Sequence, residues 1–231
     1  MTDDTLSVRG LAATYGQAIA LRGISFSVAE GSLTALLGEN GAGKTTLLRS
    51  IARLHTSTTG SIFFCGEEIS RVDPANVAAR GLTLVREGAK VFETLSVTEH
   101  IALSQRLAGL RPAGGTREDQ SLDRVWEWFP VLYERRAEKA GYLSGGQRQM
   151  LALSMALISR PKLVLLDEPS AGLAESVAEH VYSVVERLSQ EGMTLVIAEQ
   201  SSKWVGGKQG TAYLLESGQI VGTQPLDGIR A

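Results

Sequence analysis

Apolar side chains alternate with other residues in two stretches near the N-terminus. Leu6 and Val8 mark the first stretch, and Ile24, Phe26 and Val28 mark the second. A spacing of two places successive apolar side chains on one face of an extended chain. The pattern predicts two strands of a half-buried sheet with antiparallel pairing.

Three later stretches are apolar almost without interruption. They cover residues 33–37, 163–166 and 194–198, and each has the length of a short strand. Continuous apolar runs are typical of strands that are covered on both faces, as in a parallel sheet. Near the C-terminus, residues 212–221 contain two further apolar runs around a glycine turn and predict a hairpin.

Helical spacing occupies the stretches between these strands. Apolar residues recur every three or four positions in three segments, and Ser96 with Glu99 has the spacing of a capping box that opens a helix. Gly192 is placed to end the last of the three segments. The apolar positions are Leu47, Leu48, Ile51 and Leu54; Leu122, Val125, Trp126 and Phe129; and Val177, Val181, Val184, Val185 and Leu188.

Together these elements predict an α/β protein. We expect a parallel sheet core, an antiparallel N-terminal sheet, and a helical region inserted in the middle of the chain. The chain has 231 residues, of which 43% are hydrophobic and 21% charged. This size and balance suit one globular unit with a substantial core.

Charge and cysteine content restrict the expected partners and the expected cellular compartment. A formal net charge of −2, with scattered Lys and Arg, gives no basic field for nucleic acid. Cys65 has no second cysteine to pair with, so a reducing cytosol is expected. The acidic start Met-Thr-Asp-Asp is unlike a signal peptide. No apolar run approaches the ~20 residues that span a bilayer, so a membrane role requires docking onto other subunits.

Residues 38–45 fit the phosphate-binding pattern G-x-x-x-x-G-K-[ST]. Its glycines let backbone N–H groups turn toward phosphate oxygens, and the following helix points its positive end at them. Lys44 supplies a positive charge to the β- and γ-phosphates, and Thr45 offers a hydroxyl to Mg²⁺. The predicted nucleotide-binding residues are Gly38, Glu39, Asn40, Gly41, Ala42, Gly43, Lys44, Thr45 and Thr46.

The apolar run 163–166 ends in two carboxylates. Asp167 is expected near Mg²⁺, reached through water, because α/β sheets bind ligands at the carboxyl ends of their strands. Glu168 is placed to orient or deprotonate an attacking water. Downstream of a phosphate-binding loop, this pair predicts hydrolysis of the terminal phosphate.

A second phosphate-binding element is indicated by Ser144-Gly145-Gly146-Gln147. Ser144 can cap a helix, and an ordinary N-cap followed by a flexible glycine pair is one interpretation. The other interpretation is an anion site at a helix N-terminus. Since one nucleotide needs only one P-loop, a second element favours a nucleotide held by a partner.

In this order, the three motifs resemble the nucleotide-binding subunit of ABC transporters, from about Leu6 to Val221. The resemblance implies a P-loop NTPase with a RecA-like parallel sheet core. It implies a single ABC ATPase domain over 1–231, with 1–87 and 161–231 as catalytic core and about 88–160 as a helical signature subdomain. It also implies a head-to-tail dimer, with ATP between one subunit's P-loop and Ser144 to Gln147 of the other.

Further positions match the same family. Tyr15 resembles the aromatic residue that stacks on adenine, and Ser170-Ala171-Gly172-Leu173 resembles the loop that crosses the dimer interface. Glu87 stands where most relatives carry a glutamine, which is similar to the branched-chain amino acid importer group. Gln200 stands at the position of the switch histidine, as in the shorter ATPase of those importers. The expected catalytic residues are Glu168, Gln200 and Glu87.

Some positions depart from that group. Arg86 replaces a proline, Ala89 and Lys90 replace two arginines, and Ser201 to Trp204 is unlike the usual small-residue helix start. These differences bear on the identity of the transported solute and leave the expected ATPase fold unchanged.

The resemblance implies cofactors, partners and a location. ATP and Mg²⁺ are the expected cofactors. Integral membrane permease subunits, a sister ATPase subunit and, indirectly, a substrate-binding protein are the expected partners, at the cytoplasmic face of the inner membrane. No nucleic acid is expected. Three alternatives stay open: an importer for urea or short-chain amides, an ABC-type ATPase that acts on DNA or ribosomes, and a nucleotide-binding regulator that does not hydrolyse ATP.

Overall fold

A four-stranded antiparallel sheet forms one side of the protein. The computed structural model describes residues 4–88, 90–109 and 120–229. The sheet has the order β2-β1-β4-β5, and its strands are β1 (Asp4–Tyr15), β2 (Ala18–Ala29), β4 (Thr58–Phe64) and β5 (Glu67–Glu68). The alternating residues predicted to form it are buried on one face, as Leu6, Val8, Ile24 and Val28 show.

A second, six-stranded sheet carries the parallel core. Its order is β10-β9-β3-β8-β7-β6, and only β10 runs antiparallel to its neighbour. The predicted buried strands and the C-terminal hairpin are confirmed. The strands are β3 (Leu33–Leu37), β6 (Leu82–Val85), β7 (Leu163–Asp167), β8 (Thr194–Glu199), β9 (Thr211–Glu216) and β10 (Gln219–Pro225).

Helix α1 (Lys44–Ile51) lies between the two sheets. Its side chains Leu47, Leu48 and Ile51 are fully buried against apolar residues of both sheets. Leu54 was predicted on the same helical face, and this prediction is wrong. The helix ends at Ile51, so Leu54 leaves the helical periodicity and is 52% exposed.

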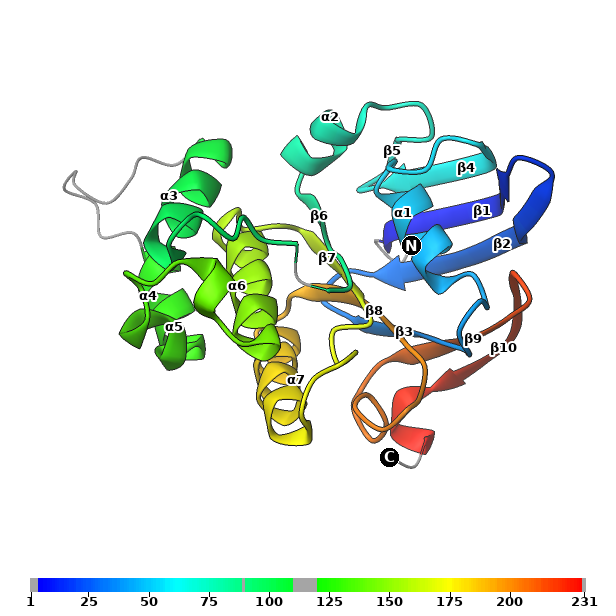
Figure 1. The fold of residues 1–231 in the computed structure, drawn as a ribbon. Helices are drawn as coiled ribbons and strands as arrows, with labels where there is room; N and C mark the ends of the chain where they lie inside the picture. The colour runs from blue at the N-terminus through cyan, green and yellow to red at the C-terminus, as the bar shows by residue number, and fades with distance from the viewer. Residues whose placement is uncertain (1–3, 89, 110–119, 230–231) are drawn as a thin grey trace.

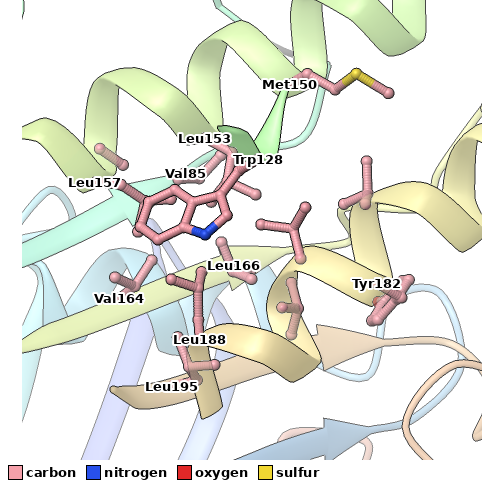
Figure 2. Close-up of a cluster of buried hydrophobic side chains, with 14 of the residues drawn as sticks. Val85, Trp128, Met150, Leu153, Leu157, Val164, Leu166, Tyr182, Leu188 and Leu195 are labelled. Atoms are coloured by element: carbon pink, nitrogen blue, oxygen red, sulfur yellow. The ribbon is translucent and has the colours of Figure 1, made fainter. Parts of the chain in front are cut away.

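The opposite face of the parallel sheet is covered by α6 (Gly145–Ile158) and α7 (Glu175–Gln190). Successive strand residues alternate between the two faces, so that Val164 and Leu166 point into this core while Leu163 and Leu165 point toward α1. Figure 2 shows side chains of α6, α7 and the central strands meeting around Trp128 of α4. The continuous apolar runs therefore serve two cores at once.

The helices that lie between β6 and α6 in the sequence are grouped at the end of the molecule away from the antiparallel sheet (Figure 1). Helix α3 (Val97–Leu107) begins with the predicted capping box of Ser96 and Glu99. It is followed by α4 (Gln120–Trp128), α5 (Pro130–Glu134) and a short 3-10 turn, η1 (Ala140–Tyr142). The expected helical subdomain at about 88–160 includes Ala89 and residues 110–119, which lie outside the described residues.

Outside the inserted helical region, two short helices of the described residues were not predicted from the sequence. They are α2 (Pro74–Ala79), which Asp73 caps, and η2 (Leu226–Gly228). Within the described ranges, every helix is too short or too polar to cross a membrane.

Candidate nucleotide-binding site

The phosphate-binding loop joins the end of β3 to the start of α1. A Cβ atom at Gly38 would come within 2.3 Å of the Leu215 carbonyl oxygen, so no side chain fits there. Gly43 has a φ of +106° and immediately precedes the first helical residue, Lys44. Both glycines are therefore required by the path of the backbone. The first turn of α1 leaves its N–H groups free to bind an anion.

Lys44 is the cation of this loop and is 3% exposed. Its Nζ donates to the carbonyl oxygens of Gly38 at 2.6 Å and Glu39 at 3.1 Å. It also pairs with Oε1 of Glu168 at 2.9 Å. These three oxygens hold the ammonium group over the loop, so its charge is oriented before any phosphate arrives.

The predicted metal ligands are in direct contact. Oγ1 of Thr45 donates a hydrogen bond to Oδ1 of Asp167 at 3.0 Å, although the two residues are far apart in the sequence. Burial raises the pKa of Asp167, the Thr45 hydrogen bond opposes this, and the nearby charges of Glu168 and Glu87 raise the pKa further. The carboxylate is therefore held in a setting that favours a nearby cation.

The side chains of Thr45 and Asp167 are chemically suited to bind Mg²⁺. A hydroxyl and a carboxylate are hard oxygen ligands of the kind that Mg²⁺ binds. Among the described residues, no group of three His, Cys, Asp or Glu side chains is arranged to hold a metal. Mg²⁺ usually keeps several waters and binds substrate phosphates. One hydroxyl and one carboxylate that binds through water are therefore enough protein ligands for Mg²⁺, but not for an ion that is bound entirely by protein side chains.

Glu168 adopts an unusual backbone conformation at the carboxyl end of β7. Its φ is +45°, in the left-handed region that few residues other than glycine occupy. Its N–H donates to the carbonyl oxygen of Ala198 at 3.0 Å. Residues held in this region are concentrated at functional sites, where the surrounding structure supports the strain.

A cavity of about 510 Å³ opens in front of the loop. It brings together most of the predicted site: Asn40, Gly41, Gly43, Lys44, Thr45, Thr46, Glu87 and Glu168. Four further lining residues were not predicted, namely Ile19, Ala20 and Arg22 of β2 and Ser217 of the β9–β10 turn. No motif marks them, because they reach the cavity only through the packing of β2 and the hairpin over the loop.

Several predicted residues do not line this cavity, namely Tyr15, Gly38, Glu39, Ala42, Asp167 and Gln200. Tyr15, at the end of β1, is 48% exposed, and its ring lies beside that of His55 with centroids 4.4 Å apart. Gln200 is exposed and follows the last residue of β8. Tyr15 belongs to the same β1–β2 hairpin as the cavity-lining residues Ile19 and Arg22.

The segment Ser144 to Gln147 lies outside the cavity as well. Ser144 caps α6 in a reciprocal capping box, accepting from the Gln147 N–H at 3.2 Å while Oε1 of Gln147 accepts from the Ser144 N–H at 2.9 Å. A Cβ atom at Gly145 would meet nothing within 4 Å, whereas one at Gly146 would lie 2.2 Å from Cγ1 of Val177. The helix N-terminus is therefore open at Gly145 and closely packed at Gly146.

The fold and the phosphate-binding loop define a P-loop NTPase. Residues 21–171 match the model of the ABC transporter family. A high-affinity branched-chain amino acid transport ATP-binding protein, BraG of Pseudomonas aeruginosa, is 38% identical over 94% of this chain and 91% of its own length. The chain belongs to the ABC transporter family, as an ATP-binding subunit that hydrolyses ATP.

Further relatives and structures agree with this assignment. A probable branched-chain amino acid transport ATP-binding protein, LivF of Archaeoglobus fulgidus, is 33% identical over 91% of this chain and 87% of its own length. A nucleotide-free ATP-binding cassette from an ABC transporter superposes with a TM-score of 0.83 at 26% identity, covering 96% of this chain and 91% of that one. The ADP conformation of the cassette MJ1267 also has a TM-score of 0.83 at 26% identity, covering 97% of this chain and 92% of that one.

Proposed function

We propose that the chain powers an importer for branched-chain or related amino acids. The relatives BraG and LivF are transport ATP-binding proteins for branched-chain amino acids, and both match nearly the whole chain. The observation that carries the ATPase part is the grouping of Lys44, Thr45 and Glu168 at one cavity of sufficient size for a nucleotide's phosphates, with Asp167 hydrogen-bonded to Thr45. The proposed solute is inferred from the relatives and from Glu87 and Gln200, which resemble the residues of that importer group.

Each residue of the site has a role in this proposal. The N–H groups of residues 41–46 bind the β- and γ-phosphates, and Lys44 exchanges Glu168 for a γ-phosphate oxygen. Glu168, released from that pair, orients the attacking water and accepts its proton. Thr45, and Asp167 through water, would hold Mg²⁺, which supplies positive charge to the phosphates. Tyr15 stacks on the base, and Gln200 donates an amide hydrogen bond to the γ-phosphate.

The second half of the site comes from another subunit in this proposal. Ser144, Gly145, Gly146 and Gln147 do not line the cavity that contains Lys44, and we propose that they bind the nucleotide of a facing subunit. The open N-terminus of α6 at Gly145 suits a phosphate of a facing subunit. Two subunits in head-to-tail arrangement complete two such sites, and the partner is a sister ATPase or a second copy of this chain.

Membrane partners complete the proposal. ATP binding closes the ATPase dimer, and closure moves the region around Glu87 against integral membrane permease subunits at the cytoplasmic face of the membrane. A substrate-binding protein delivers the solute from the other side. The free energy of ATP binding at the dimer interface thereby drives the permease to change the side of the membrane from which the solute has access.

The test is solute-dependent ATP hydrolysis by the complex reconstituted with permease, sister ATPase and binding protein. We expect leucine or a related amino acid to stimulate hydrolysis, and Glu168→Gln to abolish it while ATP binding persists. Gln200→Ala should reduce hydrolysis less, because a neutral hydrogen bond contributes less than a charged group. Stimulation by urea or a short-chain amide, with none by leucine, would replace the proposed solute. Wild-type turnover in Glu168→Gln would contradict the role of this site.

A further inference from the structure

A buried carboxylate outside the predicted site lies at the end of β8. Glu199 is 4% exposed. Its Oε1 accepts from the Ser170 hydroxyl at 2.8 Å, from the Ser170 N–H at 3.3 Å and from the Tyr182 hydroxyl. A buried carboxylate is costly unless donors compensate it, and here three donors converge on one oxygen. No sequence motif marks Glu199.

The main chain of Glu199 contacts the phosphate-binding loop. Its carbonyl oxygen accepts from the Gly38 N–H at 3.2 Å, and its Cα is paired with Leu37 of β3. The side chain points to the other face of the sheet, the face that α7 covers, as do Leu195 and Ile197. One residue thus joins the start of the P-loop to the loop that follows β7.

That second loop carries Glu168. The left-handed backbone at Glu168 is bonded on one side by its N–H to Ala198. On the other side, the Ala171 N–H donates to the Glu168 carbonyl at 3.0 Å, and Ser170 is bound to Glu199 through both its N–H and its hydroxyl. A left-handed residue that is not glycine needs support from its surroundings. Glu199 supplies that support two residues after Glu168.

Tyr182 connects this cluster to the segment after Gln200. Its ring stacks on Trp204, with centroids 5.4 Å apart and an angle of 6° between the planes. Burial raises the pKa of Tyr182 well above its ordinary value, and the charge of Glu199 raises it further. The phenol therefore stays protonated and donates to Glu199. Lys203, beside Trp204, pairs with Glu175 at the start of α7.

We propose that Glu199 is a positioning residue for ATP hydrolysis. Through Ser170, Glu199 holds the backbone of Glu168 in its left-handed conformation. Through Tyr182, Glu199 connects Glu168 to the segment after Gln200. This proposal rests on the proposed ATPase function. The carboxylate of Glu199 does not touch the nucleotide cavity, so it acts only through the two loops. Removing its donors should impair hydrolysis more than nucleotide binding, because Lys44 and the loop glycines stay in place.

The experiment compares the double variant Ser170→Ala/Tyr182→Phe with the wild type in the reconstituted complex. We expect kcat to fall about tenfold, as when an anchor of the reacting geometry is removed, while KM for ATP stays within about twofold. Glu199→Gln keeps an acceptor oxygen and should retain more activity than the double variant. The matched control is Ser183→Ala/Tyr213→Phe, which removes one hydroxyl bonded to the His180 carbonyl and one bonded to the Ser27 carbonyl, neither of which is a partner of Glu199.

A second readout does not depend on activity. Hydrogen exchange at residues 168–173 should be faster in the double variant and unchanged in the control, with β7 still protected. Unchanged exchange in this loop, or faster exchange with wild-type kcat, overturns the proposal. If the wild type itself fails to hydrolyse ATP, the proposed function is wrong, and exchange alone then decides whether Glu199 anchors the loop.

Discussion

The two glycines after Ser144 have different surroundings. Gly145 is exposed with free space around it, whereas Gly146 is buried against Val177 of α7. Family resemblance assigns both to phosphate binding, yet Gly146 is also required by the close approach of α6 and α7. A substitution at Gly146 therefore changes packing within the subunit as well as any contact with a partner's nucleotide.

Gly145→Asp is the cleaner test of the partner site. The aspartate has room in the monomer and places a negative charge where a partner's γ-phosphate would lie. We expect an unchanged melting temperature, normal ATP binding by the isolated subunit and loss of hydrolysis in the complex. Gly146→Ala should instead lower the free energy of unfolding by about 1–3 kcal/mol, as overpacking does. Normal turnover by Gly145→Asp would remove this residue from the site.

Asp167→Asn should make the nucleotide-free protein more stable at neutral pH. Burial raises the pKa of Asp167, so the unfolded chain loses this proton at lower pH than the native protein does. The free energy of unfolding therefore falls as pH rises from the ordinary Asp pKa of about 4 through the raised value. Asparagine removes this part of the pH dependence and still accepts from Thr45.

The measurement is the melting temperature of Asp167→Asn and wild type from pH 4 to 8, with and without Mg²⁺ and ATP. Without ligand, we expect Asp167→Asn to melt at a higher temperature than the wild type, by roughly 2–4 °C for each kcal/mol gained in the free energy of unfolding. We also expect a smaller further rise on adding Mg²⁺ and ATP, since the carboxylate that faces the metal is gone. Equal ligand-induced rises in both proteins would place Mg²⁺ away from Asp167.

At the scale of elements, α3 and α6 begin in the same way. Both have a serine cap and a reciprocal partner three residues later, Ser96 with Glu99 and Ser144 with Gln147. Ser96→Ala and Ser144→Ala should each lower the free energy of unfolding by about 1 kcal/mol. Only Ser144→Ala should also reduce hydrolysis in the complex. Denaturant unfolding and ATPase assays separate the two effects, and equal activity in both variants would make Ser144 a cap alone.

The same elements show which parts of the fold the sequence predicts. Alternating and continuous apolar runs predicted β1, β2, β3, β7, β8 and the C-terminal hairpin, because burial on one face or two directly determines those patterns, whereas β6 was not predicted. The helix end at Ile51 was misjudged through Leu54, because one apolar residue past a helix still fits its period. Arg22 at the cavity and the bonds of Glu199 could not be predicted, because they depend on which segments pack together.

At the scale of the whole molecule, closure of two subunits on ATP is the central expectation. Glu168→Gln should form an ATP-dependent dimer, alone or with the sister ATPase, since it binds ATP without hydrolysing it. Adding Gly145→Asp to this variant should keep the protein monomeric at the same ATP concentration. Light scattering after size exclusion, with ADP as the comparison, checks both. A dimer that forms equally with ADP or with Gly145→Asp would contradict closure through this segment.

The order of strands in the parallel sheet has a consequence for protein synthesis. Strand β3, which leads into the phosphate-binding loop, is made well before both of its neighbours, β8 and β9, which lie far downstream in the sequence. Contacts between segments so far apart in sequence form late, because the intervening chain must first be ordered. On the ribosome, β3 therefore lacks both of its sheet neighbours until they have been translated. The nascent chain completes its ATP site only after β7, β8 and β9 have been translated, so ATP cannot assist the earlier steps of folding.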